Sequence, residues 1–190
     1  MKTLNQYIKE KLIINKDYRD GCLSPKSFDE LRNIIIDRYK KFGPGTEQNP
    51  INFNDIDVSN IDSFYSSNID KGIFAETKFK YIDISYWDVS NATNMMAMFF
   101  RCKDLKSVGD ISSWDVSKVT DMSFMFYNCV SFNQDISSWD VSNVTDMKYM
   151  FCNCKSFNQD ISNWDVSNVK CYLLMFYNCQ IKEEYKPKFK

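Results

Sequence analysis

Residues 128–147 read NCVSFNQDISSWDVSNVTDM, and 25 residues further on residues 153–169 read NCKSFNQDISNWDVSNV. The phrase occurs four times, with its tryptophans separated by 27, 25 and 25 residues: Trp87, Trp114, Trp139 and Trp164. A fixed period in the twenties is typical of solenoids, in which each unit buries its apolar side against its neighbours. Repetition places like residues in rows, whereas an enzyme pocket needs unlike residues that converge on one point. The sequence therefore predicts an extended surface rather than a catalytic site.

Each repeat unit changes its apolar period halfway along. One half carries apolar residues spaced as on one face of a helix: Met122, Met125, Phe126 and Cys129. The other half alternates apolar and polar residues around Trp139, as a short strand does. We expect each unit to form a short strand, a turn through Ser-Asn, and a short helix or 3₁₀ turn. Stacked units would place their strands about 4.8 Å apart in a parallel sheet.

Composition divides the chain into three segments. Residues 1–50 are expected to form a helical N-terminal cap, because the first unit of a solenoid has no preceding neighbour to cover its apolar end. Residues 51–180 hold about five units, of which the first is degenerate. Residues 181–190 form a polar tail that closes the array.

The expected cap consists of two helices. The first follows a capping box that starts at Thr3, and its apolar face comprises Leu4, Tyr7, Ile8 and Leu12. The second has its N-cap at Ser24 with a proline at the first helical position. Apolar residues then recur every three or four positions up to Phe42, and the Gly-Pro-Gly that starts at Gly43 stops the helix.

Charge and cysteine content argue against several functional classes. Residues 51–180 hold ten Lys and Arg against sixteen Asp and Glu, and nucleic-acid binding relies on clustered positive charge, so no nucleic-acid partner is expected. The chain has no His, and four of its seven cysteines recur once per unit: Cys102, Cys129, Cys154 and Cys179. We expect these four to be buried as small hydrophobic side chains and all seven to be reduced. No metal and no cofactor are predicted.

The expected location follows from the start of the chain and its hydropathy. Residues 1–18 are charged throughout and lack the apolar run of a secretory signal. No segment approaches about 18 consecutive apolar residues, so membrane insertion is not expected. We expect an intracellular protein, in a host cytoplasm, or a virion-associated one, and a surface protein only if a leader was removed.

The repeat phrase carries a resemblance to a known family. Residues 110–134 read DISSWDVSKVTDMSFMFYNCVSFNQ, which resembles the repeat of the BspA-type leucine-rich repeat surface proteins. The resemblance is strong over residues 83–180 and weak over residues 55–82. It implies an α+β fold, a short leucine-rich-repeat-like solenoid behind the two-helix cap, and a role in adhesion or protein recognition. Members of that family are mostly secreted or surface-anchored, in bacteria, protists and some viruses.

A second resemblance concerns the opening residues. LNQYIKEKLIINKDY, residues 4–18, is similar to the starts of some proteins from phages of gut bacteria. This similarity implies a phage-encoded member with an intracellular or virion role.

Rows of identical residues are assigned to folding. The tryptophan and methionine rows are expected to fill the interior. Two rows of carboxylates run along the array: Asp83, Asp110, Asp135 and Asp160, and Asp88, Asp115, Asp140 and Asp165. We expect these to bond the backbone of turns rather than to bind calcium or to act as acid and base.

Positions that vary between otherwise identical units are the candidate binding residues, because the invariant ones are committed to folding. One variable row lies beside the tryptophans and the other lies on the expected helical side. The predicted partner-binding residues are Phe124, Tyr127, Tyr149, Leu174, Tyr177, Phe100 and Tyr86. They would form an exposed apolar stripe of the kind that marks interaction sites. The alternative is that these side chains only half-cover the adjoining turn.

These observations favour a non-enzymatic protein-recognition module that uses the surface of a solenoid. Two alternatives remain open: a phage-encoded inhibitor that binds a host protein, and a structural or assembly component of a virion. In each case the partner is a protein, and self-association is a further option. No catalytic residue is predicted, since nothing singles out one carboxylate from its repeats.

Overall fold

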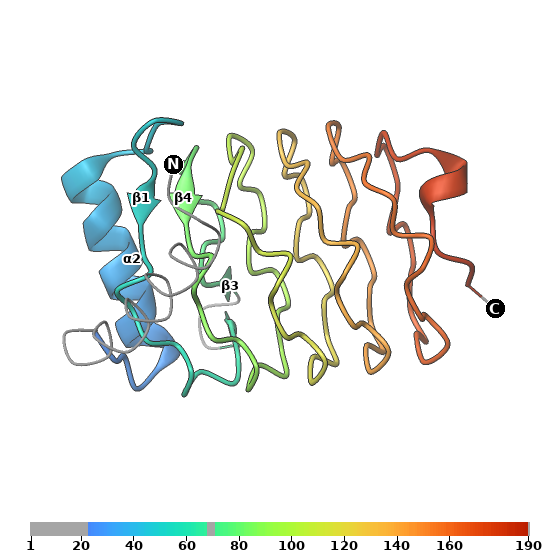
Figure 1. The fold of residues 1–190 in the computed structure, drawn as a ribbon, viewed down its shortest axis with the longest axis horizontal. Coiled ribbons are helices and arrows are strands. Elements are labelled where there is room, and N and C mark those ends of the chain that lie inside the picture. The colour runs from blue at the N-terminus through green and yellow to red at the C-terminus, as the bar shows by residue number, and fades with distance from the viewer. Residues whose placement is uncertain (1–22, 68–70, 190) are drawn as a thin grey trace, which may run out of the picture.

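The computed structural model describes residues 23–67 and 71–189. Turns of the chain follow one another from helix α2 (Phe28–Phe42) at one end to the 3₁₀ helix η2 (Glu183–Tyr185) at the other (Figure 1). Four short strands lie in the first half: β1 (Ile51–Asn52), β2 (Tyr65–Ser66), β3 (Lys71–Gly72) and β4 (Ile82–Asp83). Strands β1 and β4 pair in parallel, and β2 and β3 pair antiparallel. Across these two ranges, no helix is both long and apolar enough to cross a lipid bilayer.

Helix α2 matches the second expected helix but starts later in the chain. Its N-cap is Ser27 rather than Ser24, and the Ser27 hydroxyl accepts a hydrogen bond from the backbone N–H of Glu30. The helix buries Leu31 and Ile35 and ends at Gly43, which has a φ of 73° that favours glycine. The first expected helix, residues 4–12, lies outside the described residues.

The predicted fold class is wrong. We expected a leucine-rich-repeat-like solenoid of stacked strands and short helices behind a two-helix cap. The described ranges instead hold one α-helix and four two-residue strands, which form two separate two-stranded sheets. No helix forms within the units from residue 83 to residue 180. Between these units the expected parallel sheet is reduced to a row of single bridges: Asn94–Asp121, Asp121–Asp146 and Asp146–Cys171.

Left-handed residues explain why the apolar half of each unit is not helical. Phe124 and Asn128 have φ values of 57° and 59°, which an α-helix cannot contain. Each is the third residue of a four-residue turn. The N–H of Met125 donates to the carbonyl of Met122, and the N–H of Cys129 donates to that of Phe126. The unit is therefore built of consecutive turns.

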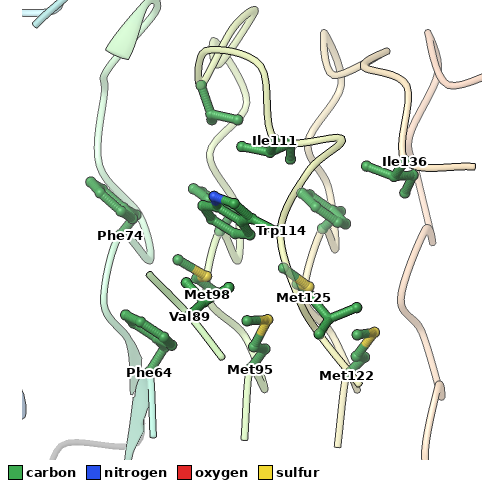
Figure 2. Close-up of a cluster of buried hydrophobic side chains, with 14 of the residues drawn as sticks. Phe64, Phe74, Val89, Met95, Met98, Ile111, Trp114, Met122, Met125 and Ile136 are labelled. Atoms are coloured by element: carbon green, nitrogen blue, oxygen red, sulfur yellow. The ribbon is translucent and has the colours of Figure 1, made fainter. Parts of the chain in front are cut away.

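Rows of like residues form the core, as expected. All four repeat tryptophans are 3–5% exposed, and Met95, Met122 and Met147 are fully buried. Figure 2 shows Met95 and Met122, and likewise Met98 and Met125, in equivalent places on neighbouring turns. The phenylalanines of the Met-Phe pairs stack in a column with ring centroids 5.5–5.8 Å apart: Phe99, Phe126, Phe151 and Phe176. The interior reading of the tryptophan and methionine rows is confirmed.

The cysteine row also lies inside. Cys102, Cys129 and Cys154 are buried, and each thiol donates to a carbonyl of the preceding unit at 2.9–3.0 Å. Burial raises the pKa of Cys102 to about 12 and raises those of Cys129 and Cys154 well above their usual range. Cys179, in the last unit, is only partly buried. The six cysteines of the described ranges are free thiols, and Cys22 lies outside those ranges.

The aspartate rows make the turn bonds that the sequence predicts. Asp115 accepts from the backbone N–H of Ser117 at 3.1 Å and from its hydroxyl at 2.6 Å. Seven more aspartates accept the N–H two residues on: Asp83, Asp88, Asp110, Asp135, Asp140, Asp160 and Asp165. The serine hydrogen bonds lower the pKa of Asp115. The expectation of side-chain-to-backbone bonds is confirmed.

Candidate protein-interaction surface

Four of the predicted residues form one aromatic patch on the side of the array. The patch consists of Phe100, Phe124, Tyr127 and Tyr149, all of which are half-buried. The ring centroids of Phe124 and Tyr149 are 4.9 Å apart and stacked, as are those of Phe100 and Tyr127 at 5.1 Å. Edge-to-face contacts join the two pairs, at 6.2 Å between Phe100 and Phe124. The aromatic patch is thus a continuous surface over three successive units.

The turn geometry presents these rings to solvent. Phe124 and Tyr149 occupy the left-handed third position of the first turn in their units, with a φ of 57° each. In such a turn the first and fourth residues face the core, as the fully buried Met122 and Met125 do. The third residue therefore points along the outer side. Leu174 has the same position and a φ of 52° in the last unit.

Of the remaining three predicted residues, Leu174 follows Phe124 and Tyr149 in the same row, on the turn whose Leu173 carbonyl accepts from the Tyr149 N–H. Leu174 and Tyr177 are exposed in the last unit, and Cys152 stands buried in the row between Tyr127 and Tyr177. Tyr86 lies in the tryptophan half, where its N–H donates to the side-chain oxygen of Asn54. The structure therefore brings together four of the seven candidates, and the expected stripe is interrupted at Cys152.

Two cations border the aromatic patch, and neither was among the predicted site residues. The Arg101 guanidinium lies 4.9 Å from the centroid of Phe100, and the Lys148 ammonium lies 5.9 Å from that of Phe124. The hydrogen bond from Lys148 to Asp146 raises the pKa of Lys148. Both cations sit at variable positions of the repeat, which is the signal that could have identified them. The patch is therefore apolar at its centre, and the cations at its border are each paired with a carboxylate, Arg101 with Glu76 at 3.5 Å and Lys148 with Asp146 at 3.1 Å.

The last unit carries further apolar exposure that sequence reasoning missed. Tyr172 and Leu173 are exposed beside Leu174. They stand where the earlier units have Met95-Met96, Met122-Ser123 and Met147-Lys148, all of which are buried or partly buried. In residues 23–67 and 71–189, no group of three His, Cys, Asp or Glu side chains is placed to hold a metal ion.

The units define a repeat protein that carries a half-buried aromatic patch on one side. The chain belongs to the family described as Mycoplasma protein of unknown function, DUF285, whose model matches residues 67–188. That family is related to the BspA-like repeat proteins. Comparison with curated proteins gave no match, and comparison with solved structures gave none either.

Proposed function

We propose that this protein is a non-enzymatic recognition module that binds a protein partner through the aromatic patch. The observation that carries the proposal is the cluster of four mutually contacting, half-exposed rings with a cation over each of two of them. Aromatic residues and arginine dominate the energetics of most protein interfaces. The relation to BspA-like repeat proteins supports a role of the adhesion and recognition type.

The chemistry of the remaining repeat residues supports this choice of surface. The aspartates, asparagines and threonines of the opposite half are occupied with bonds inside the array. The Asn143 amide donates to the carbonyl of Ser117 at 2.8 Å, and the Thr145 hydroxyl donates to that of Thr120 at 3.1 Å. The four side chains of the aromatic patch make no hydrogen bond to the described residues, so they are available to contact a partner.

The test replaces the centre of the aromatic patch while keeping its turns. Phe124→Asn, Tyr127→Ser and Tyr149→Asn are combined, because asparagine tolerates the left-handed backbone at positions 124 and 149. Immobilised wild-type and variant proteins are compared for the proteins that they capture from a lysate of the source cells. We expect the variant to keep the wild-type circular dichroism spectrum and to lose the captured partner.

The control must leave the bonds between units intact. Ser138 and Asn163 are unsuitable, because their side chains donate to carbonyls of the preceding unit at 2.6 and 3.2 Å. Ser113→Ala, Lys103→Ala and Lys155→Ala, all at exposed positions, form the matched control. Loss of the partner in the control but not in the patch variant would show that the aromatic patch is not the binding surface.

A further inference from the structure

We propose that the C-terminal end of the array docks an extended segment of another protein, which it binds through that segment's backbone carbonyl oxygens. The docking surface is the C-terminal arc, residues 172–178, which is the last set of turns. It is distinct from the aromatic patch, so the inference goes beyond the function proposed above. The bonds between successive units define its chemistry.

Each set of turns donates hydrogen bonds to the next one along the chain. The N–H groups of four alternate residues, Met122, Phe124, Phe126 and Asn128, donate to carbonyls 24 residues further on, at 2.8–3.0 Å. The next four, Met147, Tyr149, Phe151 and Asn153, do the same towards the last unit at 2.7–3.0 Å. The equivalent N–H groups of the C-terminal arc belong to Tyr172, Leu174, Phe176 and Asn178. The described residues that follow, 179–189, supply no further set of turns to meet them.

The C-terminal arc therefore ends in a row of donors. Among the residues that the structure describes, none supplies an acceptor to these four N–H groups. The tail covers part of the end, since the Phe189 ring stacks on Tyr172 at 4.1 Å. Leu173, Leu174 and Tyr177 nevertheless remain 59%, 44% and 61% exposed. Unpaired backbone donors beside exposed apolar side chains form a template for an added strand-like segment.

The opposite end of the array is closed in a complementary way. There the row presents carbonyls, and the Arg32 side chain of α2 donates to those of Gly72 and Ile73 at 2.8 Å each. A second copy of this chain consequently has no free carbonyl row to offer at that end. Two C-terminal arcs brought face to face would set N–H against N–H. The occupant is therefore a different chain that brings its own carbonyls.

Charge complements this chemistry. Residues 170–189 contain four lysines against two glutamates, whereas residues 51–180 as a whole are acidic. Lys170 and Lys182, on either side of the C-terminal arc in the sequence, are exposed, whereas Lys186 pairs with Glu183 at 2.5 Å and Lys188 lines a hollow with Asp165 and Glu184. An extended segment with acidic side chains next to its apolar ones fits this end best.

The experiment uses a probe that carries the required carbonyl row. A synthetic peptide of residues 119–131 with Cys129→Ser and two added amino-terminal glutamates reproduces the segment that accepts from the preceding unit. The full-length protein is followed by amide hydrogen exchange with and without this peptide. We expect exchange at Tyr172, Leu174, Phe176 and Asn178 to slow by at least about tenfold. The Leu173→Asp, Leu174→Asn variant should bind the peptide about tenfold more weakly.

Two controls make the result decisive. A peptide of residues 131–143, with the same added glutamates and length, comes from the other half of the unit and should leave the four amides unprotected. The exposed Lys103→Ala variant should bind the first peptide as the wild type does. Equal protection by both peptides, or none by either, would overturn the proposal. Protection that appears without peptide as protein concentration rises would also overturn it, since the occupant would then be a second copy.

Discussion

The indole N–H groups distinguish otherwise equivalent tryptophans at the scale of single residues. Trp139 donates to the carbonyl of Ile111 at 2.9 Å, whereas the Trp114 nitrogen is buried without a partner in the described ranges. Trp114 follows the one interval of 27 residues between successive repeat tryptophans. The rings of Trp114 and Trp139 are buried to a similar extent, but only the Trp139 indole nitrogen has a hydrogen-bond partner in the described ranges.

We predict that Trp139→Ala lowers the free energy of unfolding by about 3–5 kcal/mol, because it empties a large site in the core. Trp139→Phe keeps most of the packing and removes the hydrogen bond. Trp114→Phe removes a nitrogen that has no partner, so it should cost about 1 kcal/mol less than Trp139→Phe. Urea unfolding of the three variants measures both differences. An unchanged midpoint for Trp139→Ala would contradict the core assignment.

At the scale of elements, the turns explain why the sequence predicted which residues are buried but not the secondary structure that buries them. Two consecutive four-residue turns place their first and fourth residues inward, which gives apolar residues at i, i+3, i+4 and i+7. An amphipathic helix has the same spacing. Burial of Met122 and Cys129 was therefore predictable, but the element that buries them was not. The asparagines at the third position of the second turn carried the missing signal, since asparagine favours the left-handed region.

The candidate surface was predictable to a similar extent. Variation between units placed Phe124 and Tyr149 off the core-facing row, and both side chains are half-buried; their role in binding stays a prediction. The interruption at Cys152 depends on the size of one side chain at a position where its neighbours are tyrosines. The repeat spacing places Cys152 in the same row as Tyr127 and Tyr177, but it does not predict that Cys152 is buried.

The second turn of each unit yields a prediction about backbone strain. Asn128 has a φ of 59°, which costs an alanine about 1–2 kcal/mol and costs a glycine nothing. Asn128→Ala should therefore lower the melting temperature, and Asn128→Gly should change it little. Thermal unfolding followed by circular dichroism compares the two. A melting temperature lower for glycine than for alanine would mean that the side chain matters more than the backbone.

Helix α2 closes the N-terminal end of the array, and its Arg32 supplies hydrogen bonds to backbone carbonyls there. Arg32→Met keeps the length of the stem but leaves the Ile73 carbonyl without its donor and the Gly72 carbonyl with the N–H of Ala75 alone. We expect a loss of about 2–3 kcal/mol, because hydrogen bonds from a charged group are stronger than neutral ones. The exposed Lys40, also on α2, provides the control as Lys40→Met. Equal stability of the two variants would rule out the capping role of Arg32.

For the whole molecule, the buried thiols couple stability to pH. The pKa of Cys102 is raised to about 12 in the fold, against about 8.5 in an unfolded chain. The stabilisation is therefore complete below about pH 8.5 and is lost as the pH rises towards 12, by up to about 1.4 kcal/mol per pH unit for each such thiol. Urea midpoints at pH 7.5 and pH 10 should differ more for the wild type than for the combined Cys102→Ala, Cys129→Ala, Cys154→Ala variant. Identical differences would show that the thiols are accessible or already ionised.

The two ends of the array have different consequences for how the chain comes apart. One end is closed by α2 and Arg32, while at the other the four N–H groups of the C-terminal arc meet no acceptor among the described residues. Each unit bonds mainly to its immediate neighbours. When the last unit unfolds, the unit before it therefore loses its neighbour and becomes the new open end. Fraying should begin at the tail and advance towards α2 unit by unit, and refolding should grow outward from the closed end. The units would then fold in order from the N-terminal to the C-terminal end of the chain.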